Sequence, residues 1–204
     1  MRRPQYPAEC FVREDLSDCL APATVLDWGA EVTGQTIRSV TGRRTLKIDL
    51  DGRTFYLKRH TGIGLKELFK NWLSFRQPVF GARNEYLACR YLESVGIQAP
   101  IVAAFARSRG PAWRQRSLVL CEELSGFEDL ETLSLGWAVQ PPDGREVRAL
   151  VMQVATFARA FHDAGLVHRD FSICHLLRDV THPAAPLAVL DLHRARRFAE
   201  LPAR

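Results

Sequence analysis

The feature that most limits the possible folds is a run of alternating residues from Thr33 to His60, broken at two turns. In "TGQTIRSVTGRRTLKIDLDGRTFYLKRH", β-branched and aromatic residues alternate with polar ones, which is the pattern of half-buried strands. Gly42 breaks the run once, and the pair Asp51-Gly52 breaks it again. Asp-Gly favours a two-residue hairpin because both of its central positions need positive φ. The sequence therefore predicts three antiparallel strands.

Helical periodicity appears in three later segments, residues 64–75, 82–96 and 145–165. The first helix is amphipathic and basic, which fits either a core helix with a solvated back or a helix on a membrane surface. Gly96 and Gly165 are placed to end the other two helices. The third helix has the clearest apolar face, made of Val147, Leu150, Val151, Val154, Ala158 and Phe161.

Short apolar runs predict further strands at residues 100–106, 117–124 and 186–191. The expected fold class is therefore α+β. We expect an irregular segment over residues 1–30, an antiparallel-sheet lobe over 31–124 that contains the basic helix 64–75, and a mainly helical lobe over 125–204.

Composition excludes several classes of protein. Hydrophobic residues make up 47% of the 204 residues, which is enough for a folded core. The five cysteines are widely spaced and form no C-x-x-C pair, so a disulfide framework or a structural zinc site is not indicated. No uncharged run approaches transmembrane length. The net charge of +5 favours anionic partners, but the basic residues are dispersed and form no nucleic-acid-binding motif.

Four polar residues occur in an order that suits phosphoryl transfer. Lys58 lies on the third predicted strand, Glu85 early in the next helix, Asp170 in a loop after the long helix and Asp191 at the end of a strand. Phosphoryl transfer needs a cation for the nucleotide phosphates, a carboxylate to hold that cation, a base for the acceptor hydroxyl and a ligand for Mg²⁺. Strand alternation puts Lys58 on the face opposite to Leu57, so its ammonium group can reach into a cleft.

The motifs around these residues resemble those of the protein-kinase-like fold. "FYLK", "RNEYLA", "HRDFSICH" and "LDLH" are similar to the strand lysine, helix glutamate, catalytic-loop and metal-aspartate elements. More narrowly, H-R-D-x-x-I-C-H together with D-L-H-R-A resembles the lipopolysaccharide core heptose kinases, over roughly residues 25–198. That resemblance implies a kinase-like fold with an antiparallel-sheet N-terminal lobe and a helical C-terminal lobe.

The resemblance also implies a role for each matching residue. Lys58 would bind the α- and β-phosphates of ATP, and Glu85 would pair with it. Asp170 would orient and deprotonate the sugar hydroxyl, while Arg169 and His168 would brace the loop. Asp191 would bind Mg²⁺.

Two parts of the expected site depart from the protein-kinase pattern. His175 replaces the asparagine that ligates a second metal. Since Mg²⁺ prefers oxygen ligands, we expect one dominant Mg²⁺ with His175 as a further ligand, a His175 that contacts phosphate oxygens, or one that only packs with a hydrogen bond. The phosphate-covering turn has one glycine, Gly42, helped by Arg43 or Arg44. Main-chain groups from Glu122 to Leu124 would meet the adenine.

The expected function is that of an ATP-dependent, Mg²⁺-dependent kinase. It would phosphorylate a heptose hydroxyl of the lipopolysaccharide inner core, as a peripheral protein on the cytoplasmic face of the bacterial inner membrane. The alternatives are a kinase for another acceptor, such as a Kdo sugar, an aminoglycoside or a protein tyrosine, and a nucleotide-binding scaffold without turnover. Because only 13 residues follow Asp191, we expect the helical lobe to be truncated.

Overall fold

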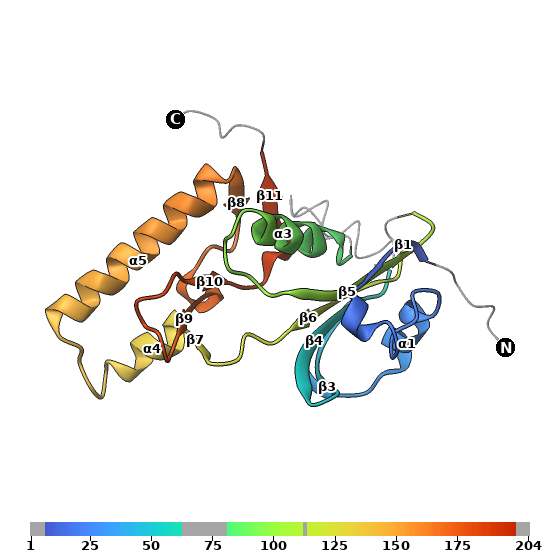
Figure 1. Ribbon diagram of the computed structural model, residues 1–204, viewed down its shortest axis with the longest axis horizontal. Helices are drawn as coiled ribbons and strands as arrows, with labels where there is room; N and C mark the ends of the chain where they lie inside the picture. The colour runs from blue at the N-terminus through green and yellow to red at the C-terminus, as the bar shows by residue number, and fades with distance from the viewer. Residues whose placement is uncertain (1–6, 63–80, 112–113, 199–204) are drawn as a thin grey trace. The chain divides into compact units, whose positions relative to one another are not determined.

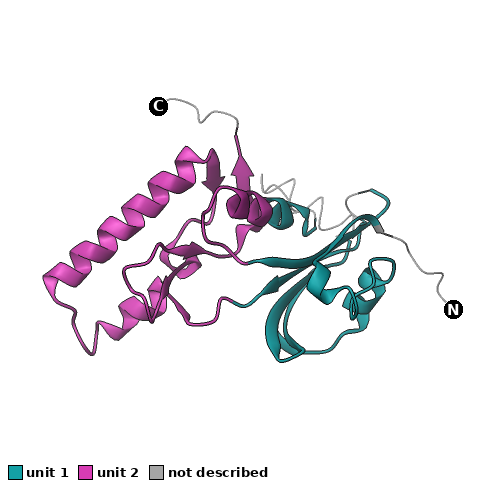
Figure 2. Cartoon of the chain, in the orientation of Figure 1, with its two compact units in different colours: residues 1–87, 101–123 teal, residues 88–100, 124–204 magenta. Residues whose placement is uncertain are grey.

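The computed structural model describes residues 7–62, 81–111 and 114–198 (Figure 1). The helix predicted over residues 64–75 lies outside these described residues. The chain divides into two compact units (Figure 2). We call residues 1–87 and 101–123 the sheet unit, and residues 88–100 and 124–204 the loop unit.

The sheet unit is built on one antiparallel sheet of six strands in the order β1-β5-β6-β4-β3-β2. The strands are β1 (Pro7–Val12), β2 (Gln35–Val40), β3 (Arg43–Leu50), β4 (Arg53–His60), β5 (Val102–Ser108) and β6 (Ser117–Glu122). The three strands predicted between Thr33 and His60 are β2, β3 and β4. Asp51 and Gly52 join β3 to β4 with φ values of 52° and 72°, as an Asp-Gly hairpin requires.

The two faces of this sheet carry different helices. Helix α1 (Val25–Glu31) packs on the face that holds Leu57 and Leu118, within one fully buried apolar core. Helix α3 (Arg83–Ser94) starts on the other face, where the ring of Tyr86 stacks on Phe105 with centroids 4.2 Å apart. Lys58 is therefore on the α3 face, because it alternates with Leu57 along β4.

The N-terminal segment is more regular than expected. We expected residues 1–30 to be irregular, whereas residues 7–12 form β1, which pairs antiparallel with β5, and residues 25–31 form α1. The partner of β1 is nearly 100 residues away in the sequence, so the strand owes its existence to a long-range pairing that local periodicity does not reveal. Helix α1 has seven residues, which is too short for a clear helical period.

The loop unit contains helices and two small antiparallel sheets, β10-β9-β7 and β11-β8. Its helices, apart from the end of α3, are α4 (Leu130–Gly136) and α5 (Gly144–Asp163). Its strands are β7 (Phe127–Asp129), β8 (Leu166–His168), β9 (Leu176–Asp179), β10 (Ala188–Val189) and β11 (Ala195–Arg197). The predicted strand at 186–191 is thus only two residues long. No helix among the described residues is long and apolar enough to span a membrane.

Helix α5 begins and ends at clear signals. The carboxylate of Asp143 accepts hydrogen bonds from the amides of Arg145 and Glu146, which caps the helix N-terminus. Gly165 follows the C-terminus with φ of 75°, the left-handed conformation that glycine adopts at little cost.

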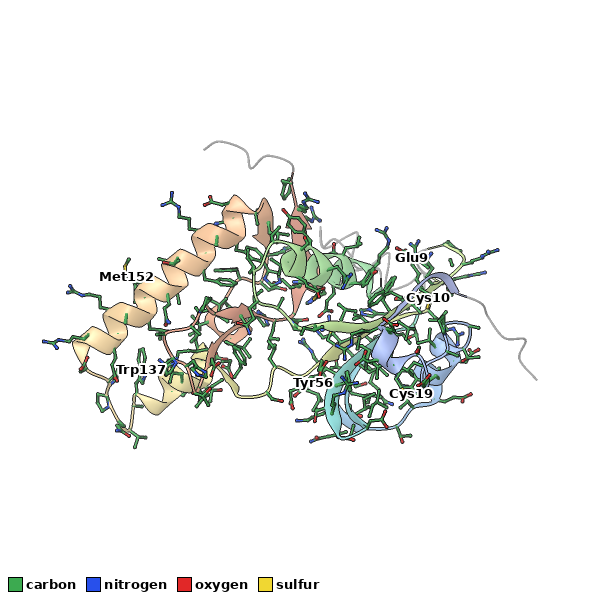
Figure 3. The ribbon with its side chains drawn as sticks, viewed as in Figure 1. Glu9, Cys10, Cys19, Tyr56, Trp137 and Met152 are labelled. Atoms are coloured by element: carbon green, nitrogen blue, oxygen red, sulfur yellow. The ribbon has the colours of Figure 1, made fainter. Side chains whose placement is uncertain are left out.

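The buried face of α5 differs from the predicted one at two positions, Val151 and Phe157. Leu150, Phe157 and Phe161 are buried, whereas Val151 is 59% exposed. Successive helical residues are rotated by about 100°, so a buried stripe centred on the two phenylalanines turns Val151 outward. Met152, labelled on α5 in Figure 3, is also exposed.

Candidate active site

In the sheet unit, Lys58 and Glu85 form a buried ion pair. Nζ of Lys58 lies 2.5 Å from Oε1 of Glu85, and their side chains are 16% and 3% exposed. Oε2 of Glu85 is buried and makes no hydrogen bond within the described residues. Because a buried carboxylate is costly without a counter-charge, Glu85 fixes the position of the ammonium group, which keeps some access to solvent.

The structure separates the two arginines that follow Gly42. Residues that are directly paired across two antiparallel strands have their side chains on the same face of the sheet. Between β3 and β4, Arg44 is paired with Arg59, and Thr45 is paired with Lys58. Arg44 therefore lies on the α1 face, opposite to Lys58, and the structure does not bring it to the predicted phosphate site. Arg43 is two residues from Thr45 and shares the face of Lys58. Gly42 has φ of 77° and forms the turn.

Two main-chain amides of the segment expected to contact adenine are already hydrogen-bonded within the protein. The amide of Glu122 donates to the carbonyl of Ile101, and the amide of Glu123 donates to that of Thr54. The Glu122 carboxylate pairs with Arg13 at 2.7 Å. An adenine contact therefore has to come from carbonyl groups of this segment or from the main chain of Leu124.

A polar cluster that the sequence did not indicate lies at the same end of the sheet. Oε1 of Glu123 accepts hydrogen bonds from Nζ of Lys47 at 2.8 Å and from the hydroxyl of Tyr56 at 3.0 Å. Tyr56, labelled on β4 in Figure 3, is two residues from Lys58 and on the same face. Lys47, followed by Tyr56, lowers the pKa of the Glu123 carboxyl, whereas burial and Glu123 raise the pKa of Tyr56.

In the loop unit, two short strands hold the catalytic-loop motif beside the second aspartate motif. Strands β8 and β11 pair antiparallel, with His168 opposite Ala195. The amide of Leu190 also donates to the carbonyl of His175 at 2.8 Å. Phe171 stacks on Phe157 of α5 with ring centroids 6.2 Å apart. The loop between β8 and β9 is therefore fixed at both ends and in its middle.

His168 connects the loop to the backbone of Asp191. Its Nε2 lies 3.0 Å from the Asp191 carbonyl oxygen, so Nε2 is the donor and Nδ1, which is buried and has no partner among the described residues, is unprotonated. Burial lowers the pKa of His168, in keeping with a neutral ring. The backbone of Asp191 has φ of 56° and ψ of 47°, a left-handed conformation that is uncommon for residues other than glycine.

The Asp191 carboxylate offers the oxygen ligand that Mg²⁺ prefers, and His175 lies beside it. Nδ1 of His175 donates to the carbonyl of Asp170 at 2.8 Å, and its Nε2 lies 4.0 Å from Oδ2 of Asp191. A ligating histidine usually donates its other nitrogen to such a carbonyl. Among the described residues, no group of three or more His, Cys, Asp or Glu side chains is placed to hold a metal. Mg²⁺ is often bound by one or two protein groups together with substrate phosphates.

Asp170 and Asp191 each contact a residue of the D-L-H-R-A segment. Nη1 of Arg194 lies 3.2 Å from Oδ1 of Asp170, and Nδ1 of His193 lies 2.9 Å from Oδ1 of Asp191. The segment was recognised in the sequence, but neither of its basic residues was assigned a role. Arg169 is exposed and makes no hydrogen bond to another described residue, so its bracing role stays a prediction.

The sequence matches one family model and several known proteins. The model of the Lipopolysaccharide kinase (Kdo/WaaP) family matches residues 28–204. The chain is 40% identical over 175 residues to lipopolysaccharide core heptose(I) kinase WaaP of Pseudomonas aeruginosa, covering 84% of this chain and 65% of the relative. It is 38% identical over 178 residues to the Escherichia coli K12 protein of the same name, covering 85% and 67%. The chain thus spans about two thirds of the length of these relatives.

A solved structure has the same fold. "WaaP in complex with acyl carrier protein" superposes with a TM-score of 0.78 at 31% identity, covering 95% of this chain and 75% of that one. The superposition confirms the predicted α+β, kinase-like fold class. The family match over most of the sequence, together with these relatives, shows that the chain belongs to the lipopolysaccharide kinase (Kdo/WaaP) family.

Proposed function

We propose that the chain is an ATP-dependent kinase that phosphorylates a heptose hydroxyl of the lipopolysaccharide inner core. The observation that carries the proposal is the buried pair of Lys58 and Glu85, an ammonium group held in place by a carboxylate that is itself 3% exposed. A fixed ammonium on a central strand is what a kinase needs for the α- and β-phosphates of ATP.

In this proposal the sheet unit supplies nucleotide binding. Lys58 contacts the α- and β-phosphates while Glu85 holds its ammonium in position. Main-chain groups near Gly42, with the side chain of Arg43, neutralise further phosphate oxygens. The adenine contacts main-chain groups between Glu122 and Leu124. Arg44 is left out of this set, since it lies on the opposite face of the sheet.

The loop unit supplies the groups for transfer. The Asp170 carboxylate accepts the proton of the sugar hydroxyl as the hydroxyl oxygen bonds to the γ-phosphorus, and the bond from that phosphorus to the β,γ-bridging oxygen breaks to release ADP. Arg194 orients Asp170 through the contact at 3.2 Å, while His168 and Arg169 brace the loop. Asp191 and His175 hold Mg²⁺, which neutralises charge on the β- and γ-phosphates when bound.

The acceptor and the location are proposed from the relatives. The matched proteins of Pseudomonas aeruginosa and Escherichia coli are named as core heptose(I) kinases, and we assign the same acceptor class here. A lipopolysaccharide precursor is anchored in a membrane, so the enzyme would work as a peripheral protein on the cytoplasmic face of the inner membrane. The net charge of +5 favours an anionic surface.

Transfer of radiolabelled γ-phosphate from ATP to lipopolysaccharide core lacking that phosphate tests the proposal. We expect labelling by the native chain and its loss in Asp170→Asn, which preserves the shape of the side chain. Asp163→Asn is the matched control, because Asp163 is 72% exposed at the end of α5. Equal labelling by Asp170→Asn and the control would contradict the role of Asp170. Stabilisation by Mg·ATP without any labelling by the native chain would favour the scaffold alternative.

A further inference from the structure

A hollow of about 330 Å³ lies on the α1 face of the sheet unit, away from the Lys58 face. Leu26, Gly29 and Ala30 of α1 form one wall, and the ends of β2, β3, β4 and β6 form the other. This volume is within the range of small-ligand sites. Gly42 and Arg43, which the proposed nucleotide site uses, also border the hollow at the β2–β3 turn.

The lining is strongly basic. It includes four arginines and a histidine, and no carboxylate among the described residues. Arg44 and Arg59 are paired across β3 and β4, so their guanidinium groups lie on the same face. Burial, and then the neighbouring charge of Arg44, lower the pKa of Arg59. Like charges kept this close without a carboxylate leave an excess of positive charge in the hollow.

The structural roles of these arginines use only part of their hydrogen-bonding capacity. Arg59 donates from Nη1 to the carbonyls of Gly29 and Ala30 at the end of α1. Nη2 of Arg116 pairs with Asp27 at 3.0 Å, while its buried Nε has no partner among the described residues. Arg44 is exposed, and its side chain makes no hydrogen bond to any other described residue. Capping of α1 explains Arg59 but leaves Arg44 without a structural purpose.

We propose that this hollow binds a phosphate group, in the form of a phosphate monoester or diphosphate, through Arg44, Arg59 and Arg116. Guanidinium groups present paired N–H donors that match phosphate oxygens, and a doubly charged group offsets the repulsion between Arg44 and Arg59. The three arginines of the proposal lie on the opposite face of the sheet from Lys58, whereas Arg43, the fourth arginine of the lining, shares the face of Lys58. The proposed binding does not depend on phosphotransfer, so the two proposals fail independently.

Calorimetric titration of the full chain with inorganic pyrophosphate, at constant ionic strength and without Mg²⁺, tests the site. We expect Arg44→Gln to weaken binding about tenfold or more, since it removes a charge-assisted contact. Arg109→Gln is the matched control, because Arg109 is an exposed arginine of the same unit with no hydrogen bond to a described residue. The control should bind like the native chain.

Three results would overturn the proposal. The first is no binding of pyrophosphate by the native chain. The second is equal weakening by Arg44→Gln and Arg109→Gln, which would reflect net charge only. The third is binding that Arg44→Gln leaves unchanged, which would place pyrophosphate at another site of the chain. If binding occurs as proposed, hydrogen exchange of the peptide that spans the β2–β3 turn should slow when pyrophosphate is added.

The source of the phosphate group is distinguished with vesicles. Phosphatidylcholine vesicles with and without phosphatidic acid are compared for binding of the native chain and of Arg44→Gln. Binding that needs phosphatidic acid and Arg44, and that pyrophosphate does not displace, assigns the site to a membrane headgroup. Binding of pyrophosphate with no Arg44-dependent binding to vesicles assigns it to a soluble phosphorylated molecule.

Discussion

Removal of the lysine of the buried ion pair should destabilise the sheet unit strongly. In Lys58→Met, the carboxylate of Glu85 stays 3% exposed and loses its counter-charge, while its Oε2 already lacks a hydrogen-bond partner among the described residues. Loss of one partner from a buried ion pair costs about 3–5 kcal/mol. We expect the free energy of unfolding of the sheet unit to fall by that amount.

A double substitution separates the cost of the stranded charge from the loss of the lysine. In Lys58→Met with Glu85→Leu, no charge remains at the site, and replacement of both partners by apolar side chains of similar size is about neutral. The double variant should therefore recover stability to within about 1 kcal/mol of the native chain. It should remain inactive in the labelling assay, because it lacks the cation for the ATP phosphates.

Hydrogen exchange of peptides from β4 gives the local free energy of opening in each variant. Arg83→Met is the matched control: Arg83 starts the same helix and pairs with Glu9 at 2.9 Å, but the two side chains are 45% and 31% exposed. An exposed pair of this kind contributes about 0–1 kcal/mol. If Lys58→Met is no more destabilising than Arg83→Met, Glu85 is solvated in the absence of lysine and the burial argument is wrong.

Three further predictions concern the loop unit. Asp191→Asn should abolish Mg²⁺-dependent transfer with little change in thermal stability. Asp191→Ala should lower the free energy of unfolding by about 1 kcal/mol more than Asp191→Asn, because alanine is disfavoured at φ of 56°. Equal melting temperatures of the two variants would argue against backbone strain at this position. Because burial lowers the pKa of His168, the unfolded chain takes up its proton at a higher pH than the folded chain does, so the free energy of unfolding by denaturant should fall as the pH drops below about 6.5. His168→Gln should flatten that dependence, and an unchanged slope would contradict it. Arg194→Gln should lower kcat by about tenfold or more with little change in the KM for ATP, and Arg194→Lys should recover part of the loss; an unaltered kcat would remove Arg194 from the mechanism.

The parts of the fold that could be predicted are those with local causes. The hairpin at Asp51-Gly52 follows from two residues that tolerate positive φ. The end of α5 follows in the same way from Gly165. The pairing of β1 with β5 depends on residues nearly 100 positions apart, and no local pattern encodes it. Val151 was predicted on the buried face because it is apolar, whereas the packing of Phe157 and Phe161 decides which way the helix faces.

The candidate site divides in the same way. The identities and order of Lys58, Glu85, Asp170 and Asp191 could be read from motifs, and Lys58 was placed correctly by alternation along its strand. The separation of Arg44 from Lys58 follows from the register of β3 and β4, which the two-residue turn at Asp51-Gly52 already fixes in the sequence. The contact between Arg194 and Asp170 depends on the pairing of β8 with β11, again a long-range feature.

The two imidazoles of the loop motif have complementary tasks. His168 binds the carbonyl of Asp191, and His175 binds the carbonyl of Asp170, so each ring contacts the backbone of one aspartate and not its carboxylate. The backbones of both aspartates are thus held by imidazole donors, whereas each carboxylate accepts from a basic residue of the D-L-H-R-A segment, Arg194 or His193. This arrangement fixes each aspartate through its main chain as well as through its carboxylate. It also leaves Nε2 of His175 oriented towards Asp191, where a divalent cation can use both.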